Sequence, residues 1–197
     1  MENTKKYSWK LQDIIFVAML CVVFGVIYLA AVWLIVPLSA IFTPLGVSLA
    51  GTEMIFGIWF MAATLAPYII QKPGVAIVAE VLASLIEVLL GYMYGPMVIV
   101  AGIVQGAGAE LVFAAWKYKR FDRTSMYLAS VGCCITGFIW SFIRSGYGKI
   151  ALPLLVLYFV LRLISSLLFA GVISKLMGDS LAKTGLLKSY ALGGHRD

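Results

Sequence analysis

Four glutamates, each within or at the end of a long apolar stretch, are the residues of this sequence best placed to do chemistry. They are Glu53, Glu80, Glu87 and Glu110. A charged side chain near the centre of a lipid bilayer costs about 3 kcal/mol or more, so it is retained where it has a partner such as a ligand, an ion or a proton pathway. Acidic side chains outnumber basic ones inside these stretches. This excess favours a ligand that is cationic or rich in hydrogen-bond donors.

The composition is that of a membrane protein. Hydrophobic residues make up 62% of the 197 residues, and the mean hydropathy is +1.01, both too high for a soluble domain of this length. Only helices and closed barrels can satisfy their backbone in lipid. We therefore expect an all-α integral membrane protein, multi-pass in the cell membrane, with residues 1–197 forming a single transmembrane domain.

Six segments have about the length that a helix needs to cross the hydrocarbon core. Proline and glycine occur at several of the breaks between them. The expected spans are Leu11–Val36, Glu53–Ile70, Gly74–Gly91, Met97–Trp116, Ser125–Phe142 and Ile150–Leu176.

The basic residues predict the orientation. Positive charge concentrates on the cytoplasmic side of membrane proteins, and an even number of spans puts both termini on one side. Only Arg144 and Lys149 flank the other side, and Arg162 lies inside the last span. We therefore expect both termini in the cytoplasm, on the side that carries Lys5, Lys6, Lys10, Lys72, Lys117, Lys119, Arg120, Arg123, Lys175, Lys183, Lys188 and Arg196. Because topology accounts for this charge, we expect no nucleic-acid partner.

A cleft open to the outside is the expected site. Glu80 and Glu87 are almost two turns apart, so they share a helix face at a separation of about 10 Å. Tyr92 and Tyr94 follow at the outer end of the same span. The other candidate ligand-binding residues are Glu53, Phe56, Trp59, Gln105, Glu110 and Trp140.

Each candidate also has a structural alternative. Glu80 can pair with Arg162. Glu53 can be an acidic residue at a helix N-terminus, where the helix dipole favours it. Glu110 can pair with Lys117. The glutamine can serve a contact between helices, and the aromatic residues can belong to an interface belt.

The segment between the first two spans, Pro37–Thr52, is apolar and uncharged. Such a segment is expected to pack over the bundle, as a lid would. The alternative is a static segment at the membrane interface with no gating role.

The sequence lacks the residues that several kinds of chemistry require. His195 is the one histidine, no GxxxxGK phosphate-binding loop occurs, and the three cysteines do not have metal-ligand spacing. We expect no cofactor, no metal site and no catalysis by this chain. A membrane enzyme acting on a lipid is the remote alternative.

Two stretches carry a family resemblance. The sequence AEVLASLIEVLLGYMYGP at 79–96, with VAGIVQGAGAELVFA at 100–114, is similar to the YkoE-like family of S components, the substrate-binding subunits of energy-coupling-factor (ECF) vitamin transporters. The resemblance extends over essentially the whole chain. It implies an S-component helix bundle that captures thiamine or hydroxymethylpyrimidine from outside.

The resemblance also implies partners, namely a membrane coupling (T) protein and two cytoplasmic ATPases. The family's alanine-xxx-alanine coupling motif on the first span is not strictly present. The nearest small residues are Ala18, Cys21 and Gly25, and small residues let helices approach closely. A cation- or proton-coupled carrier working alone, with the glutamates as its relay, remains the alternative function.

Thiamine suits the carboxylates chemically. It carries a permanent thiazolium cation and an aminopyrimidine with donor and acceptor edges. A carboxylate can accept a bidentate bond from the aminopyrimidine edge, while a second carboxylate and aromatic faces can hold the cation. Glu80 and Glu87 can supply the two ends.

Overall fold

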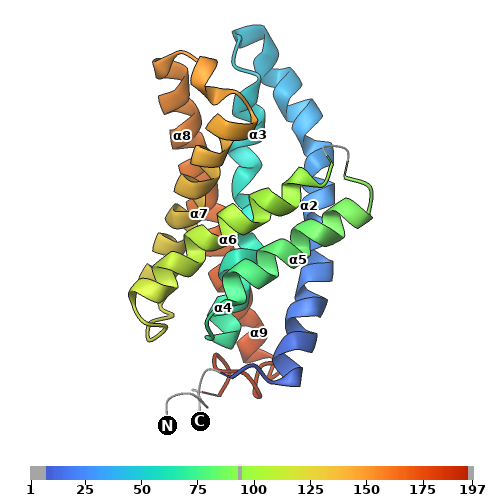
Figure 1. The fold of residues 1–197 in the computed structure, drawn as a ribbon, viewed down its shortest axis with the longest axis vertical. Coiled ribbons are helices and arrows are strands. Elements are labelled where there is room, and N and C mark those ends of the chain that lie inside the picture. Colours follow the sequence, from blue (N-terminus) through green and yellow to red (C-terminus); the bar gives the residue numbers. More distant parts are fainter. Residues whose placement is uncertain (1–7, 93–94, 195–197) are drawn as a thin grey trace.

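The computed structural model describes residues 8–92 and 95–194. Throughout these ranges every regular element is helical, and most of the helices run along the long axis of the molecule, with α5 and α6 crossing it obliquely (Figure 1). The elements are α2 (Leu11–Phe42), η1 (Thr43–Leu45), α3 (Leu49–Ile55), η2 (Phe56–Phe60), α4 (Met61–Ile70), α5 (Val75–Leu89), α6 (Met97–Ala115), α7 (Arg123–Arg144), η3 (Tyr147–Lys149), α8 (Leu152–Ser166), η4 (Leu167–Ile173) and α9 (Ser174–Lys183).

Within the described residues, five continuous helical segments are long and apolar enough to cross a membrane. These are Leu11–Leu45, Leu49–Ile70, Met97–Ala115, Arg123–Arg144 and Leu152–Lys183. The expected sixth span is α5, which has 15 residues and is therefore roughly 22 Å long, shorter than a hydrocarbon core of about 30 Å. Five of the six expected spans are supported, and α5 is a shorter, oblique helix beside them.

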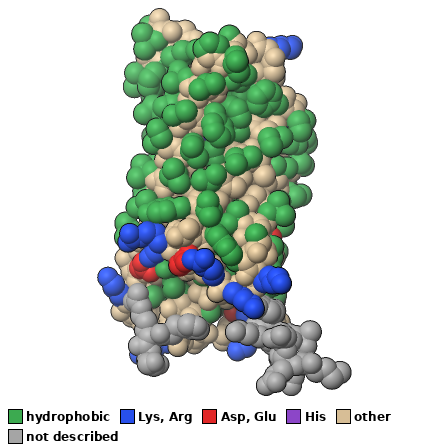
Figure 2. All heavy atoms as spheres, turned by 90° about the vertical axis from the view of Figure 1, so that its left-hand side faces the viewer, with side chains coloured by type: hydrophobic (Ala, Val, Ile, Leu, Met, Phe, Trp, Pro, Cys, Tyr) green, Lys and Arg blue, Asp and Glu red, His purple; other side chains and the backbone are tan. Residues whose placement is uncertain are grey.

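The outer surface is apolar over most of its height. In Figure 2 hydrophobic side chains cover most of the visible face, and most of the charged side chains gather toward the lower end. Val23 of α2 and Ile143 of α7 are exposed although apolar. Such a surface is suited to lipid, because an apolar face of this extent is rare on a soluble monomer.

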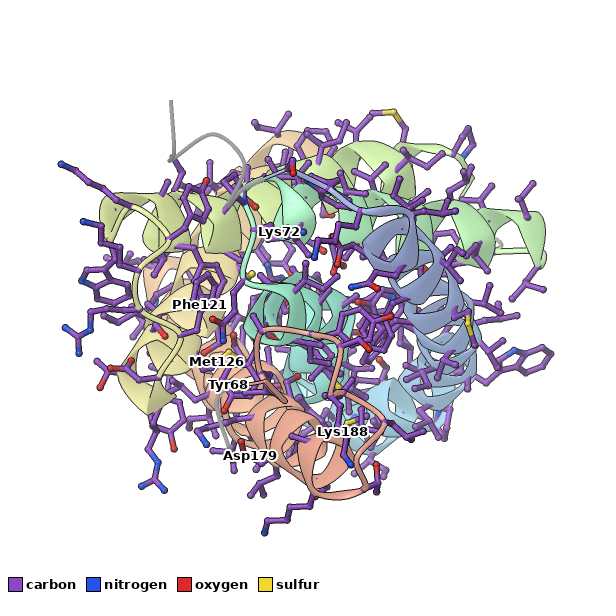
Figure 3. The ribbon with its side chains drawn as sticks, turned by 90° about the horizontal axis from the view of Figure 1, so that it is seen from below. Tyr68, Lys72, Phe121, Met126, Asp179 and Lys188 are labelled. Atoms are coloured by element: carbon purple, nitrogen blue, oxygen red, sulfur yellow. The ribbon has the colours of Figure 1, made fainter. Side chains whose placement is uncertain are left out.

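The end with the chain termini is closed by polar contacts and by the C-terminal segment. Figure 3 views this end and places Tyr68, Lys72, Asp179 and Lys188 around it. The Tyr68 hydroxyl donates to Asp179 at 2.7 Å, and Lys72 forms a salt bridge with Asp13 at 2.5 Å. These contacts tie the starts and ends of helices together at one end of the bundle.

The C-terminal segment returns to the bundle after α9. The Leu192 amide donates to the carbonyl of Ile69 at 3.2 Å, which satisfies a group at the end of α4. Tyr190 donates to the carbonyl of Gln12 at 3.2 Å, and Leu187 is buried in the core. Residues 184–194 therefore belong to the packed fold.

The segment expected as a lid, Pro37–Thr52, is mostly helical. Helix α2 continues through Pro37 to Phe42, a 3-10 turn follows, and α3 begins at Leu49. A Cβ on Gly51 would lie 2.5 Å from the backbone of Leu38, so the two arms pack without space for a side chain. The segment is a helical turn rather than an irregular loop, and its closure over a ligand stays a prediction.

Two of the three residues expected to contact a partner face the inside. The Cys21 thiol donates to the Ala79 carbonyl of α5 at 3.2 Å, and a Cβ on Gly25 would lie 2.5 Å from Cγ2 of Ile86. The small residues of α2 thus serve close packing against α5. This corrects the assignment of Cys21 and Gly25 to a partner surface. Ala18 alone of the three is exposed.

Candidate ligand-binding site

A cavity of about 330 Å³ lies among α2, α3, α5, α6, α7 and α8. Its walls include the end of α7 and the start of α3, which lie away from the termini (Figure 1). Ligand pockets commonly enclose about 300–1,000 Å³, so this volume suits a small organic molecule. The aromatic and polar residues that line it are Thr52, Phe56, Trp59, Ser84, Tyr92, Gln105, Trp140, Ser141, Arg144, Ser145, Tyr147 and Arg162.

The structure brings five of the candidate residues together around this cavity. They come from segments far apart in the chain, and four of them are aromatic. Their rings offer faces on which a flat ligand can stack and over which a cation can sit. These residues are Phe56, Trp59, Tyr92, Gln105 and Trp140. Tyr94, the remaining aromatic candidate, lies outside the described residues.

Glu87 lies behind the cavity wall. Its side chain is fully buried, and the indole N–H of Trp59, itself a wall residue, donates to its Oε1 at 3.1 Å. Its Oε2 is buried with no hydrogen-bond partner among the described residues. Buried polar atoms are nearly always paired. Glu87 therefore has one oxygen available to bind a ligand.

Glu80 lies on the same face of α5 as Glu87, farther from the cavity. The Tyr28 hydroxyl and the Ala63 amide both donate to its Oε2 at 3.0 Å. Tyr28 in turn accepts from the Ala62 amide at 3.1 Å. Since the first amides of a helix have no partner within it, Glu80 and Tyr28 satisfy the start of α4. The other oxygen of Glu80 is buried without a hydrogen-bond partner in the described part of the chain.

Glu53 is committed to an internal ion pair. Its Oε2 accepts from Nε of Arg162 at 2.5 Å and its Oε1 from Nη2 at 2.6 Å, and both side chains are fully buried. Arg162 also donates to Oγ of Ser141 at 3.0 Å. The alternative that paired Arg162 with Glu80 was wrong, because Arg162 pairs with Glu53. The alternative that made Glu53 a charge at a helix N-terminus was also wrong, because α3 begins four residues before Glu53.

Two aromatic side chains complete this cluster. The Tyr147 hydroxyl donates to Glu53, and the Phe56 ring lies 3.8 Å from the Arg162 guanidinium carbon. Burial and the nearby Glu53 carboxylate raise the pKa of Tyr147 well above its usual value. Its hydroxyl therefore keeps its proton and stays a donor. This cluster cross-links α3, α7 and α8 beside the cavity.

The charges around the cavity differ from the expectation of an acidic cleft. Its lining contains Arg144 and Arg162 and no carboxylate. Glu53 compensates Arg162, whereas Arg144 forms no salt bridge with any other described residue. The acidic groups Glu80 and Glu87 lie one layer behind it.

Glu110, a residue of α6, does not line the cavity. Its side chain lies beside the start of α5. It accepts from the Gly74 amide at 2.5 Å and the Ala76 amide at 3.0 Å, at the start of that helix. A carboxylate here satisfies free amides and complements the helix dipole. Tyr118, rather than the expected Lys117, is its side-chain partner at 2.7 Å. We assign Glu110 to positioning α5 instead of to ligand binding.

Three residues of the site were not predicted from the sequence. Tyr28 holds Glu80, while Tyr147 and Ser141 hold the Glu53–Arg162 pair. A lone tyrosine inside an apolar span was a usable signal for Tyr28, since its hydroxyl needs a partner when buried. For Tyr147 and Ser141 no local signal separates them from ordinary loop and helix residues. Among the described residues, no group of three or more His, Cys, Asp or Glu could hold a metal ion.

Comparisons with known proteins all point to a component of a transport system. Residues 12–136 match the family model of the "ABC-type cobalt transport system, permease component". The chain is 43% identical over 192 residues to the "Putative HMP/thiamine permease protein YkoE" of Bacillus subtilis (strain 168), covering 94% of this chain and 91% of that protein. It also matches a crystal structure of an S-component of an ECF transporter with a TM-score of 0.89 and 42% identity, covering 95% and 93% of the two chains.

Proposed function

Because this chain belongs to the YkoE-like family of S components, the substrate-binding subunits of ECF transporters, we propose that it captures thiamine or its precursor hydroxymethylpyrimidine from outside the cell. The observation that carries this proposal is the aromatic-lined cavity backed by two buried glutamates with unpartnered oxygens. A flat cationic heterocycle is the kind of ligand that such an arrangement suits.

The matched family model is named for cobalt transport, but the cavity favours an organic ligand. A transition-metal ion is bound by imidazole, thiolate or carboxylate groups that converge on one point. No such convergence occurs in the part of the chain that the structure describes. The aromatic side chains Phe56, Trp59 and Trp140 instead provide faces for a ring.

In the proposed complex the ring systems stack among the aromatic side chains and the thiazolium is held near Glu87. Rotation of the Trp59 indole would bring the free oxygen of Glu87 to the ligand. Gln105 and Ser84 line the cavity and offer donor and acceptor groups to the pyrimidine edge. Glu80, on the same face of α5, is held by Tyr28 and the Ala63 amide behind this part of the site.

The proposed orientation follows from charge. The start of α2 and the segment that follows α9 lie at one end of the bundle (Figure 1), and most of the described basic residues flank that end. The positive-inside rule then puts the termini in the cytoplasm. The cavity, walled by the end of α7 and the start of α3, would open to the outside.

Uptake against a gradient requires partners in this proposal. The chain has no GxxxxGK loop, and binding alone equilibrates a substrate without accumulating it. We propose a membrane coupling protein and two cytoplasmic ATPases as partners, with the exposed face of α2 around Ala18 as the contact. The lone protein in liposomes should bind thiamine without accumulating it. Accumulation driven by a proton gradient would instead support the carrier that works alone.

The direct test is calorimetry of thiamine binding to the purified protein and to Glu87→Gln. Loss of a charge-assisted bond of about 1–3 kcal/mol predicts a rise in Kd of about 5- to 150-fold. Asp179→Asn, at the opposite end of the bundle, is the control and should keep the original Kd. Unchanged affinity in Glu87→Gln would reject this residue as a ligand group. Mass spectrometry of small molecules that co-purify with the protein identifies the ligand independently.

A further inference from the structure

Among the described residues, Glu87 has no compensating cation. It is fully buried, it receives one hydrogen bond from a neutral donor, Trp59, and none of the salt bridges between described residues includes it. An ionised carboxylate in such surroundings is strongly disfavoured unless it is paired.

The elements packed against α5 bring no positive charge to it. These elements are α2, α4 and α6. Their described titratable groups are Asp13, which pairs with Lys72 at the far end, Cys21 and Tyr28 on α2, Tyr68 on α4 and Glu110 on α6. Helix α5 itself adds Glu80, a second acid that is bonded to the neutral donors Tyr28 and Ala63 and brings no positive charge.

The cations of the cavity wall are also unsuited to pair with Glu87 in this state. Arg162 donates its hydrogen bonds to Glu53 and Ser141. Arg144 lies at the end of α7 and is exposed. The neutral acid is thus the form of Glu87 that the ligand-free arrangement stabilises, with its proton on the oxygen that lacks a partner.

We propose that thiamine binding exchanges a cation for a proton at Glu87. This inference rests on the proposed function and deepens it. In the ligand-free protein the carboxylic acid is neutral. When the thiazolium arrives, Oε2 releases its proton to solvent and the resulting carboxylate pairs with the ligand's positive charge. The net charge buried at the wall is the same before and after, since one proton leaves for each cation that enters.

The exchange makes a distinction between the two candidate ligands. Hydroxymethylpyrimidine has no thiazolium, so it gives Glu87 no reason to ionise. Thiamine affinity should rise about tenfold per pH unit for as long as the free protein holds the proton. Affinity for hydroxymethylpyrimidine should not follow this slope. The site therefore discriminates in favour of the complete vitamin as the pH rises.

The experiment is titration calorimetry of the full chain in detergent, in two buffers of different protonation enthalpy at one pH. The difference in the measured heat gives the number of protons released per ligand. We expect about one for thiamine and about zero for hydroxymethylpyrimidine. Glu87→Gln should bind thiamine without release. Glu80→Gln, on the same helix, is the matched variant and should retain release in whatever binding remains.

Thiamine binding to the natural protein without proton release would overturn the exchange and leave the proposed function standing. Release that persists in Glu87→Gln would overturn the assignment to this residue. If Glu87→Gln does not fold, the two-ligand comparison on the natural protein still decides the question. Absence of binding by both ligands would refute the proposed substrates, and the exchange with them.

Discussion

Removing the Glu53 carboxylate should be among the most damaging single changes in this bundle. Glu53→Gln keeps the size of the side chain but leaves the Arg162 guanidinium, fully buried, without its counter-charge. Two charge-assisted bonds, at 2.5 and 2.6 Å, weaken together, and the Tyr147 hydroxyl loses a charged acceptor. Breaking a buried pair from one side costs about 3–5 kcal/mol, because the remaining charge stays desolvated.

The assay is thermal unfolding in detergent, followed by intrinsic tryptophan fluorescence. For a chain of this length each kcal/mol shifts the midpoint by about 2–4 °C, so Glu53→Gln should lower Tm by about 6–20 °C. Arg120→Gln is the matched control. It also breaks a pair, with Asp122, but the two side chains are 54% and 47% exposed, and such surface pairs contribute about 0–1 kcal/mol.

A double variant separates the charge from the packing. Glu53→Gln combined with Arg162→Gln removes both charges, so it should be destabilised by clearly less than the sum of the two single changes. Two results would refute the reasoning. One is a Tm for Glu53→Gln that matches that of Arg120→Gln. The other is simple additivity in the double variant.

Two further predictions concern packing and pH. Gly25→Leu should lower stability by about 1–3 kcal/mol in the same unfolding assay, since its Cβ meets Ile86 at 2.5 Å, whereas Ala18→Leu on the exposed face should not; equal effects would contradict the inward orientation of Gly25. The Ser125 amide and Arg120 lower the pKa of Asp122, so its capping of α7 stabilises the protein above the unfolded-state pKa of about 4 and is lost as pH falls through the lowered value. The Tm gap between the natural protein and Asp122→Ala should therefore shrink on acidification, and a gap independent of pH would contradict this.

Hydropathy predicted most of the fold because burial in lipid depends on composition and length. It failed where those quantities are marginal. The predicted window Gly74–Gly91 included Gly74, Leu90 and Gly91, which are not part of the 15-residue helix α5, so the window was longer than the element. Pro37 was read as a break, yet α2 continues to Phe42, since neighbouring groups in membrane helices can compensate for the amide that proline lacks.

The sequence predicted which residues lie at the candidate site better than it predicted which of them pair with one another. Aromatic residues and Gln105 were identified by their positions near span ends and centres, and the cavity gathers them. The partner of Arg162 was wrong because periodicity says which residues share a face of one helix and nothing about which helices meet. The same limit put Gly25 on an outer surface when it packs against Ile86.

The pairing of Glu53 with Arg162 has a consequence for how the protein is made. The two residues are 109 positions apart, and Arg162 belongs to the last membrane-crossing segment, Leu152–Lys183. During synthesis the glutamate enters the bilayer before its arginine has been translated, so it must remain neutral or hydrated at the insertion site. The arginine, in turn, can insert favourably when the earlier helices offer it an acid. We therefore expect the final segment to enter against a preassembled bundle, with biogenesis completed only at that step.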